Sequence, residues 1–313
     1  MWMLLVLIYG LLKGAREIVK KISLKKNSAM EVLVVYTGIA FFLVALEVLL
    51  VNVFPIFSTI LPDVEKELSM EPEMYIYVAI KSFVIFIAWI LSFVAISRLP
   101  LSLYGVLDLS RVLFATCLGV FILGETLKIT QGIGLILVGL GLFMLKFRPR
   151  PILTLLEKAG LYKEEKAVSP NKEVASKVYV ICAFISCLLN AISGLLDKIL
   201  MKDITSTQLQ FWYMLFLFIF YVIFVLIRRI PISKSAITNK WIWLLSIMFV
   251  FADKALFIAN GVTESKITVM TLIKQSACIV TILGGKLIFK EKNISYKILC
   301  ACTIIVGILF GII

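Results

Sequence analysis

The sequence predicts an all-α integral membrane protein with ten transmembrane helices, arranged as two inverted repeats of five helices each. Hydrophobic residues make up 61% of the 313 positions and charged residues 16%, against about 45–50% and about 25% in soluble globular proteins. Apolar stretches of the ~20 residues that cross a ~30 Å hydrocarbon layer recur along the chain. Two distant regions also share one pattern of helices and turns, which indicates an internal duplication.

The expected spans are ten stretches, each apolar over most of its length and bounded by polar connections. They lie at about 1–19, 32–53, 75–97, 101–123, 128–147, 178–201, 207–228, 240–262, 266–288 and 294–313. The first stretch does not resemble a secretory signal, because Lys13, Arg16 and Lys20 follow its apolar run and no small-residue cleavage site is evident. We therefore expect it to be a helix of the mature protein.

The repeat is clearest between residues 95–147 and 259–313, where apolar helices alternate with a short polar turn and a turn that carries a glutamate. Aligning the copies pairs Glu125 with Glu291, Asp108 with Lys274 and Ser110 with Ser276, and a weaker match of the opening helices pairs Gly14 with Gly194 and Glu17 with Asp197. The polar linker 148–177 separates two predicted domains, 1–147 and 178–313. Because five helices separate equivalent points, the second domain should enter the membrane from the opposite face.

The connections between spans alternate sharply in charge. Most Lys and Arg residues, beginning with Lys20, lie in the odd-numbered connections, whereas the even-numbered ones carry only Lys66, Lys128, Lys202 and Lys266. Short basic loops stay in the cytoplasm, so we expect a multi-pass protein of the plasma (inner) membrane with both termini outside. The acidic segment 54–74 fits an external loop. Topology thus accounts for the net charge of +13, and nucleic acid is not an expected partner.

The composition gives little support to metal or hydrolytic chemistry. The chain contains no histidine, which is the commonest metal ligand and general base. Its six cysteines fall inside apolar runs without the spacing of metal ligands, so we interpret them as small hydrophobic residues. A phosphate-binding loop of the GxxxxGK[ST] kind is absent from the sequence. We therefore expect neither an enzyme nor a bound cofactor or metal.

Nine ionisable residues fall well inside the expected spans. They are Glu47, Lys81, Asp108, Arg111, Asp197, Lys198, Asp253, Lys254 and Lys274. A charged side chain at a helix centre costs about 2.5–3.5 kcal/mol when it faces lipid, so such groups should face partners or a hydrated cavity. Asp197, Lys198 and Lys81 lie near the external ends of their spans, and for Asp197 and Lys198 we favour snorkelling to the interface.

Some of these residues are candidates for a substrate site. The candidates for substrate binding are Arg111, Lys274, Lys254, Gln275 and Lys81, and those for carrying a coupled proton are Asp253 and Asp108. Asp108 and Arg111 share a helical face at i, i+3, so either the pair neutralises itself or each meets a partner across the bundle. Asp253 and Lys254 are adjacent and point about 100° apart, so each needs a partner on another helix.

Small and acidic residues suggest how the helices pack. Glycine pairs recur at Gly307 and Gly311, Gly132 and Gly139, and Gly134 and Gly141, which predicts close helix contacts within the bundle or between copies. Glu125 and Glu291 precede the last helix of each repeat, where a carboxylate favours the positive end of the helix dipole. We interpret both glutamates as structural.

The stretch AISRLPLSLYGVLDLSRVLFATCLGVFILGETLKITQGIGLILVGLGLFML from Ala95 resembles the membrane unit of the drug/metabolite transporter superfamily, EamA type. The AxxRLPLS turn, the LGE turn and the glycine-rich closing helix carry the resemblance. The second half is similar more loosely, with FKEK at the LGE position. The resemblance implies a carrier of five plus five helices around a central cavity, with Asp108, Arg111, Lys254 and Lys274 as cavity candidates.

These observations predict a secondary active transporter of a small polar metabolite, anionic or zwitterionic, that works by alternating access. Embedded basic residues slightly outnumber embedded acidic ones, which favours a substrate with a carboxylate or phosphate. Expected partners are the small-molecule substrate, the lipid bilayer and a coupled proton or counter-substrate. The sequence is also compatible with a homodimer. Three alternatives also remain: a multidrug or cation exporter of the same superfamily, a membrane-embedded lipid-modifying enzyme, and a lipid-handling protein.

Overall fold

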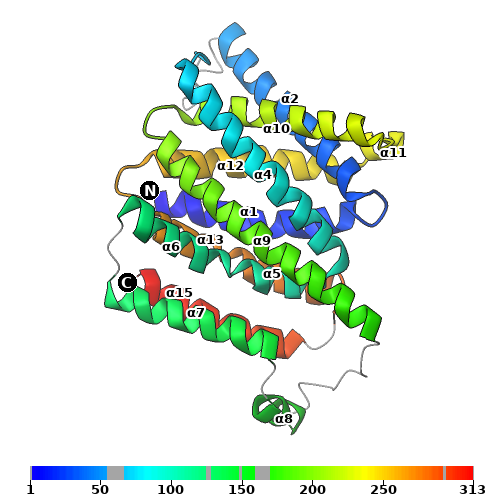
Figure 1. Ribbon diagram of the computed structural model, residues 1–313, viewed down its shortest axis with the longest axis vertical. Coiled ribbons are helices and arrows are strands. Elements are labelled where there is room, and N and C mark those ends of the chain that lie inside the picture. The colour runs from blue at the N-terminus through cyan, green and yellow to red at the C-terminus, as the bar shows by residue number, and fades with distance from the viewer. Residues whose placement is uncertain are drawn as a thin grey trace.

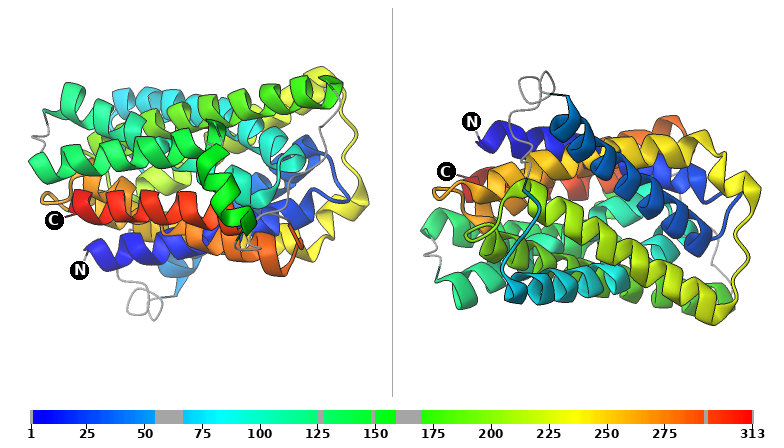
Figure 2. Two further views of the ribbon diagram at one scale, coloured as in Figure 1. Left: turned by 90° about the horizontal axis from the view of Figure 1, so that it is seen from below. Right: turned by 90° about the horizontal axis from the view of Figure 1, so that it is seen from above.

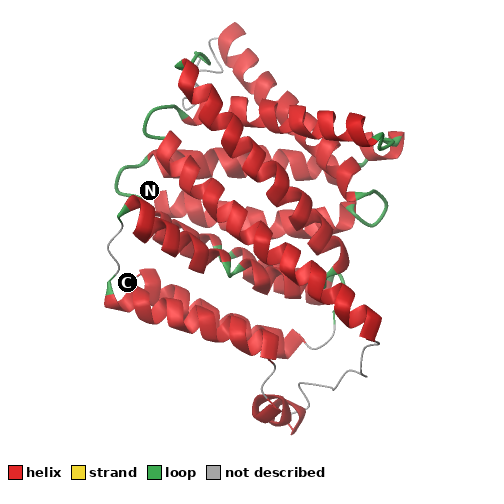
Figure 3. Cartoon of the chain, in the orientation of Figure 1, coloured by secondary structure: helices red, strands yellow, loops and turns green. Residues whose placement is uncertain are grey.

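The computed structural model describes residues 2–54, 67–124, 128–147, 150–158, 170–291 and 294–312. Every regular element in these ranges is a helix, and no strand occurs in them (Figure 3). The helices are α1 (Trp2–Ser23), α2 (Ala29–Val53), α4 (Pro72–Arg98), α5 (Leu101–Asp108), α6 (Arg111–Leu123), α7 (Ile129–Phe147), α8 (Arg150–Lys158), α9 (Pro170–Leu200), α10 (Ser206–Arg228), α11 (Lys234–Ile237), α12 (Lys240–Gly261), α13 (Ile267–Lys274), α14 (Ala277–Leu287) and α15 (Ile294–Ile312). The long helices form one bundle, and both termini lie at the same end of it (Figures 1 and 2).

Seven helical segments of the described residues are long and apolar enough to cross a membrane. They are Ala29–Val53, Pro72–Arg98, Leu101–Leu123, Lys177–Leu200, Ser206–Arg228, Lys240–Gly261 and Ile267–Leu287. The other three expected spans coincide with α1, α7 and α15. Helix α1 is less apolar because it carries Lys13, Arg16, Glu17, Lys20 and Lys21. The chain is a multi-pass membrane protein.

The segment 148–177 is more helical than its polar composition suggests. Helix α8 lies within it, outside the main bundle (Figure 1). Helix α9 begins at Pro170, which is compatible with helix geometry because proline is tolerated in the first turn. Residues 159–169 of this linker, residues 55–66 of the acidic segment and Glu125 lie outside the described residues.

Helix packing follows a pattern that is unchanged when the two halves of the chain are exchanged. Helix α1 packs against α12, and α4 packs against α9. Helix α5 packs against α14, and α6 packs against α13. The remaining two pairs are α2 with α10 and α7 with α15. The repeat predicted from the sequence would make α1 equivalent to α9, α4 to α12, α5 to α13 and α6 to α14. Each contact therefore has its counterpart in the other half.

The fourth and ninth expected spans are each broken in the middle, between α5 and α6 and between α13 and α14. At the first break the Ser110 N–H donates to the Leu107 carbonyl at 3.0 Å, and at the second the Ser276 N–H donates to the Ile273 carbonyl at 3.1 Å. These i to i+3 bonds form a tighter turn than an α-helix, and such turns often mark hinges. The predicted repeat pairs Ser110 with Ser276, so the two breaks lie at matching positions of that alignment.

Helix α1 approaches the second break closely. A Cβ atom on Gly14 would lie 2.7 Å from the Ala277 carbonyl oxygen, and one on Gly10 would lie 3.2 Å from the Lys274 carbonyl oxygen. Because glycine has no Cβ, the backbones can approach to this distance. The two glycines therefore allow α1 to pack against the broken span.

The glycines of α7 and α15 divide into two groups. A Cβ on Gly307 would lie 2.6 Å from the Gly134 carbonyl oxygen, and one on Gly141 would lie 2.9 Å from the Cys300 carbonyl oxygen. The glycine contact predicted from the sequence is therefore made within the bundle at Gly141 and Gly307. A Cβ added to Gly132 or Gly139 would meet no described atom within 4 Å.

Glu291 joins the two halves at the start of α5. Its carboxylate accepts hydrogen bonds from the backbone N–H groups of Leu101 and Ser102 and from the Ser102 hydroxyl, and it pairs with Lys297 at 3.3 Å. We expected Glu291 to act on the helix that follows it, but these backbone contacts are to α5 of the other half. The reason is that Pro100 precedes α5 and provides no side-chain cap, which leaves N–H groups that need an acceptor.

Candidate functional site

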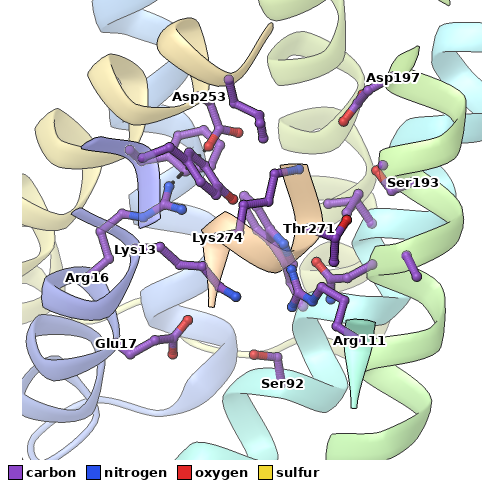
Figure 4. A pocket seen from close by; sticks show the side chains of 18 of the residues that line it. Lys13, Arg16, Glu17, Ser92, Arg111, Ser193, Asp197, Asp253, Thr271 and Lys274 are labelled. Carbon is purple, nitrogen blue, oxygen red and sulfur yellow. Dashed lines mark hydrogen bonds and ion pairs between the residues drawn. The ribbon is translucent and has the colours of Figure 1, made fainter. Parts of the chain in front are cut away.

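A cavity of about 100 Å³ lies between α1, α4, α6, α9, α12 and α13, with tyrosines from α2, α5 and α10 in its wall (Figure 4). Nine charged side chains line it: Lys13, Arg16, Glu17, Lys20, Lys81, Arg111, Asp197, Asp253 and Lys274. Such a volume holds several waters or a small metabolite. The charged groups come from helices of both halves of the chain.

One face of α1 supplies four of the charged side chains. Lys13, Arg16, Glu17 and Lys20 are spaced i, i+3, i+4 and i+7, which places them on one side of a helix. We had placed Lys20 in a cytoplasmic connection, and this is wrong: α1 continues to Ser23, and Lys20 is only 5% exposed. The helical spacing was the signal in the sequence that could have identified this face.

Lys20 lines the cavity and has several partners. Its ammonium group pairs with Glu17 at 3.1 Å and donates to the Ser92 hydroxyl at 2.6 Å. Ser92 in turn lies 2.6 Å from the Tyr104 hydroxyl, and the ammonium lies 4.2 Å from the centre of the Phe93 ring. Lys20 is thus held by a carboxylate, a hydroxyl and an aromatic face.

Asp108 is shared by two cations. Its carboxylate accepts a hydrogen bond from Lys13 of α1 and forms a 2.8 Å ion pair with Arg111, three residues along the chain. Cys187 of α9 also approaches the carboxylate, with its sulfur 3.7 Å from Oδ1. The sequence left open whether Asp108 pairs with Arg111 or with a residue across the bundle. The structure shows both, because the carboxylate pairs with Arg111 and also with Lys13 of α1.

Asp253 pairs with Arg16 of α1 at 3.2 Å. The Arg16 guanidinium also lies 5.4 Å from the centre of the Tyr9 ring and 5.0 Å from that of Phe249, distances at which a cation is attracted to an aromatic face. As the 100° separation of neighbouring residues predicts, Lys254 points elsewhere and donates to the Thr207 hydroxyl of α10 at 2.6 Å. Lys254 is not among the residues that line the cavity.

Lys81 and Asp197 form a buried ion pair at 2.9 Å between α4 and α9. The Lys81 ammonium lies 3.3 Å from the centre of the Tyr213 ring and 4.9 Å from that of Phe257. We expected Asp197 to snorkel to the interface, and this is wrong because its partner is inside the bundle. The sequence could not reveal the pairing, since the two residues come from different halves.

Lys198, the neighbour of Asp197, has a different environment. Its ammonium donates to the carbonyls of Asn260 and Val262 and to the Ser265 hydroxyl at 3.0, 2.8 and 2.6 Å. These acceptors surround the end of α12, where carbonyl groups lack partners within the helix. Lys198 therefore binds to the protein rather than to the interface, contrary to our expectation.

Lys274 stands at the end of α13, at the second break, and its side chain extends into the cavity (Figure 4). The residue is only 7% exposed. Among the described residues no hydrogen bond or ion pair to its ammonium is found, and its nearest aromatic contact is the Tyr9 ring, whose centre lies 5.6 Å away. Gln275, the next residue, is buried outside the cavity lining, and its Nε2 has no described hydrogen-bond partner.

The charges of the cavity do not cancel. Six of the lining side chains are basic, Lys13, Arg16, Lys20, Lys81, Arg111 and Lys274, and three are acidic, Glu17, Asp197 and Asp253. Asp108 adds a fourth carboxylate through its contacts with Lys13 and Arg111. Among the described residues, two positive charges therefore lack a matching carboxylate. These residues contain no group of three or more His, Cys, Asp or Glu side chains suited to hold a metal ion.

Fold and site together define a multi-pass membrane protein that encloses a small charged cavity. The sequence matches the model of the EamA-like transporter family over residues 1–147 and 177–313, and the chain belongs to that family. The resemblance to EamA-type members of the drug/metabolite transporter superfamily is thereby confirmed.

Comparison with other proteins adds the fold but no substrate. A solved crystal structure, titled only as that of a protein, is similar over 99% of this chain and 94% of its own, with a TM-score of 0.67 and 11% sequence identity. At that identity the likeness shows the fold alone. No curated protein matches the sequence.

Proposed function

We propose that this chain is a secondary active transporter of a small anionic metabolite. The observation that carries the proposal is the excess of two basic side chains around the cavity. Buried cations without counter-ions are costly, so the site is suited to a ligand that brings negative charge. A zwitterion would also bring a carboxylate to these cations. The charged wall disfavours a lipophilic cation as substrate.

Two inverted domains of five helices, 1–147 and 178–313, are part of this proposal. The exchange symmetry of the helix contacts and the equivalent breaks after Asp108 and Lys274 support it. Two alternative packings of such domains, related by the symmetry, would expose the cavity to one side of the membrane and then to the other. Basic connections in the cytoplasm and both termini outside fit the same arrangement.

Lys274 and Arg111 are the residues that we propose to bind the anion directly. Lys274 has no described counter-ion, and Arg111 shares Asp108 with Lys13. Both lie beside a break in a span, where the backbone can adjust during transport. Lys81 lines the cavity but is already paired with Asp197, and Lys254 is not among the lining residues, so neither is proposed to bind the anion directly.

Binding of anions to the purified protein tests the proposal. A panel of malate, succinate, glutamate and phosphate should include at least one compound that raises the thermal midpoint, because a ligand of the folded state stabilises it by mass action. Lys274→Gln should weaken that binding by at least about tenfold, equivalent to about 1.4 kcal/mol. Lys254→Gln, which removes an embedded lysine outside the cavity, should leave it within about twofold. Stabilisation by lipophilic cations and by no anion would refute the proposal.

A further inference from the structure

We propose that Lys274 couples the movement of the anion to that of a proton. The inference rests on the proposed function and adds to it the residue that carries the proton. In this scheme the side chain is an ammonium while an anion is bound and a neutral amine when the cavity is empty. One proton then crosses the membrane with each anion, in the same direction.

The pairing of the cavity charges singles out Lys274. Each carboxylate already has a cation: Glu17 has Lys20, Asp108 has Lys13 and Arg111, Asp197 has Lys81, and Asp253 has Arg16. Protonating any of these carboxylates would leave a cation without its counter-ion. Removing a proton from Lys274 breaks no such pair. We therefore place coupling at Lys274 and not at Asp253 or Asp108, the carboxylates that the sequence suggested.

The charged groups around Lys274 include no described carboxylate that lacks a cation of its own. Helix α1 presents Tyr9, Lys13 and Arg16, α6 presents Arg111, α9 presents Asp197, and α12 presents Asp253. Three of these are cations, and the two carboxylates are held by Lys81 and Arg16. From α15, which also packs against α13, Lys297 is bound to Glu291 and Ser102, and the Tyr296 hydroxyl donates to the Met144 carbonyl.

The chemistry of the amine fits a cycle of this kind. A buried ammonium without a counter-ion is unfavourable. A lysine can avoid this by giving its proton to water in the cavity, whereas an arginine cannot. When the bound anion is singly charged, the ammonium and the anion cross together as a neutral pair. After the anion leaves, the proton follows it into water, and the empty carrier returns with one fewer buried charge. Proton and charge therefore balance over the cycle.

Lys274→Arg separates binding from coupling, because guanidinium keeps its charge throughout the pH range of a transport assay. Proteoliposomes are loaded with the panel anion that stabilises the protein most, and uptake of the same labelled anion is followed with and without an inward proton gradient. With a gradient of about one pH unit, the wild type should accumulate a singly charged anion about tenfold at electroneutral one-to-one coupling. The Arg variant should exchange anions across the membrane but show no accumulation.

The proposal would be overturned if the Arg variant accumulated the anion as strongly as the wild type. It would also be overturned if uptake by the wild type were the same with and without the proton gradient. Loss of accumulation in Asp253→Asn with wild-type behaviour in Lys274→Arg would move the coupling to Asp253.

A further measurement needs no substrate. In detergent, Lys274→Met should raise the thermal midpoint of the empty protein at neutral pH, because the wild-type lysine must give up on folding a proton that the unfolded chain keeps. This gain should shrink as pH rises toward about 10.4, where the lysine of the unfolded chain also becomes neutral. A constant difference across pH would count against the inference. If no panel anion binds but the pH-dependent gain is seen, the proposed substrate class fails while the protonation behaviour of Lys274 stands.

Discussion

Arg111 and Asp108 lie on opposite sides of the break between α5 and α6, and their side chains form a 2.8 Å ion pair across it. The same carboxylate accepts a hydrogen bond from Lys13 of α1. The equivalent break in the other half has Lys274 at the position of Asp108, without an ion pair to a described residue. The break between α5 and α6 is thus held by an ion pair, whereas the break between α13 and α14 directs the Lys274 ammonium into the cavity.

Asp108→Asn should destabilise the protein strongly. Two buried cations would lose a shared counter-ion, and breaking a buried pair in this way costs about 3–5 kcal/mol. The midpoint of thermal unfolding in detergent would measure the loss. Adding Lys13→Met to the same chain removes one of the two stranded cations and should recover part of the stability. No recovery in the double variant would show that Asp108 acts through something other than this charge balance.

Gly14→Ala should destabilise the bundle, whereas Gly194→Ala at the equivalent position of α9 should not. The added Cβ at Gly14 would lie 2.7 Å from the Ala277 carbonyl oxygen, but at Gly194 it would meet no described atom within 4 Å. Overpacking of this kind costs about 1–3 kcal/mol, while alanine in an open helical position gains up to about 1 kcal/mol over glycine. Unfolding midpoints of the two variants give the comparison, and equal effects would contradict the close approach of α1 to the break.

Glu291→Gln should weaken the bundle at neutral pH and remove part of its acid sensitivity. Burial opposes the charge of Glu291, but hydrogen bonds from Ser102 and the charge of Lys297 outweigh it and hold the pKa of this carboxyl below 4.5. Because the folded-state pKa lies below the unfolded value, the stabilisation is complete above about pH 4.5 and is lost as pH falls through the folded pKa.

The loss at pH 7 should be about 0.5–2 kcal/mol, the range for a helix cap. Thermal unfolding between about pH 7 and pH 3 would measure it, with Glu264→Gln, a glutamate on an exposed turn, as the matched control. If the wild type and Glu291→Gln lose the same stability as pH falls, Glu291 does not contribute to the acid sensitivity.

The helices were predictable because each span is a long apolar run, and the hydrocarbon thickness fixes its length. The breaks after Asp108 and Lys274 were not, since neither Pro nor Gly lies at residues 108–111 or 274–277, where the helices are interrupted. The ends of helices in polar segments were also hard to place, as Pro170 shows, because polar composition does not prevent a helix.

The site was only partly predictable. Embedded charge identified Arg111, Lys274, Lys81 and Asp253 as candidates, and all four line the cavity. The charged face of α1 escaped notice because its residues follow the apolar run and look like a cytoplasmic flank. Pairings such as that of Lys81 with Asp197 depend on which distant helices touch, and no local pattern in one sequence encodes that.

Cys187 gives the protein a built-in reporter. Its thiol is 2% exposed and lies against Asp108, at the contact between α9 and α5. A water-soluble maleimide can reach it only after those helices separate, so its alkylation rate follows the opening of that contact without any engineered label. With Cys117, Cys182 and Cys302, the more accessible thiols, replaced by serine or alanine, the same reaction would reveal whether a bound solute shields the thiol or speeds its modification.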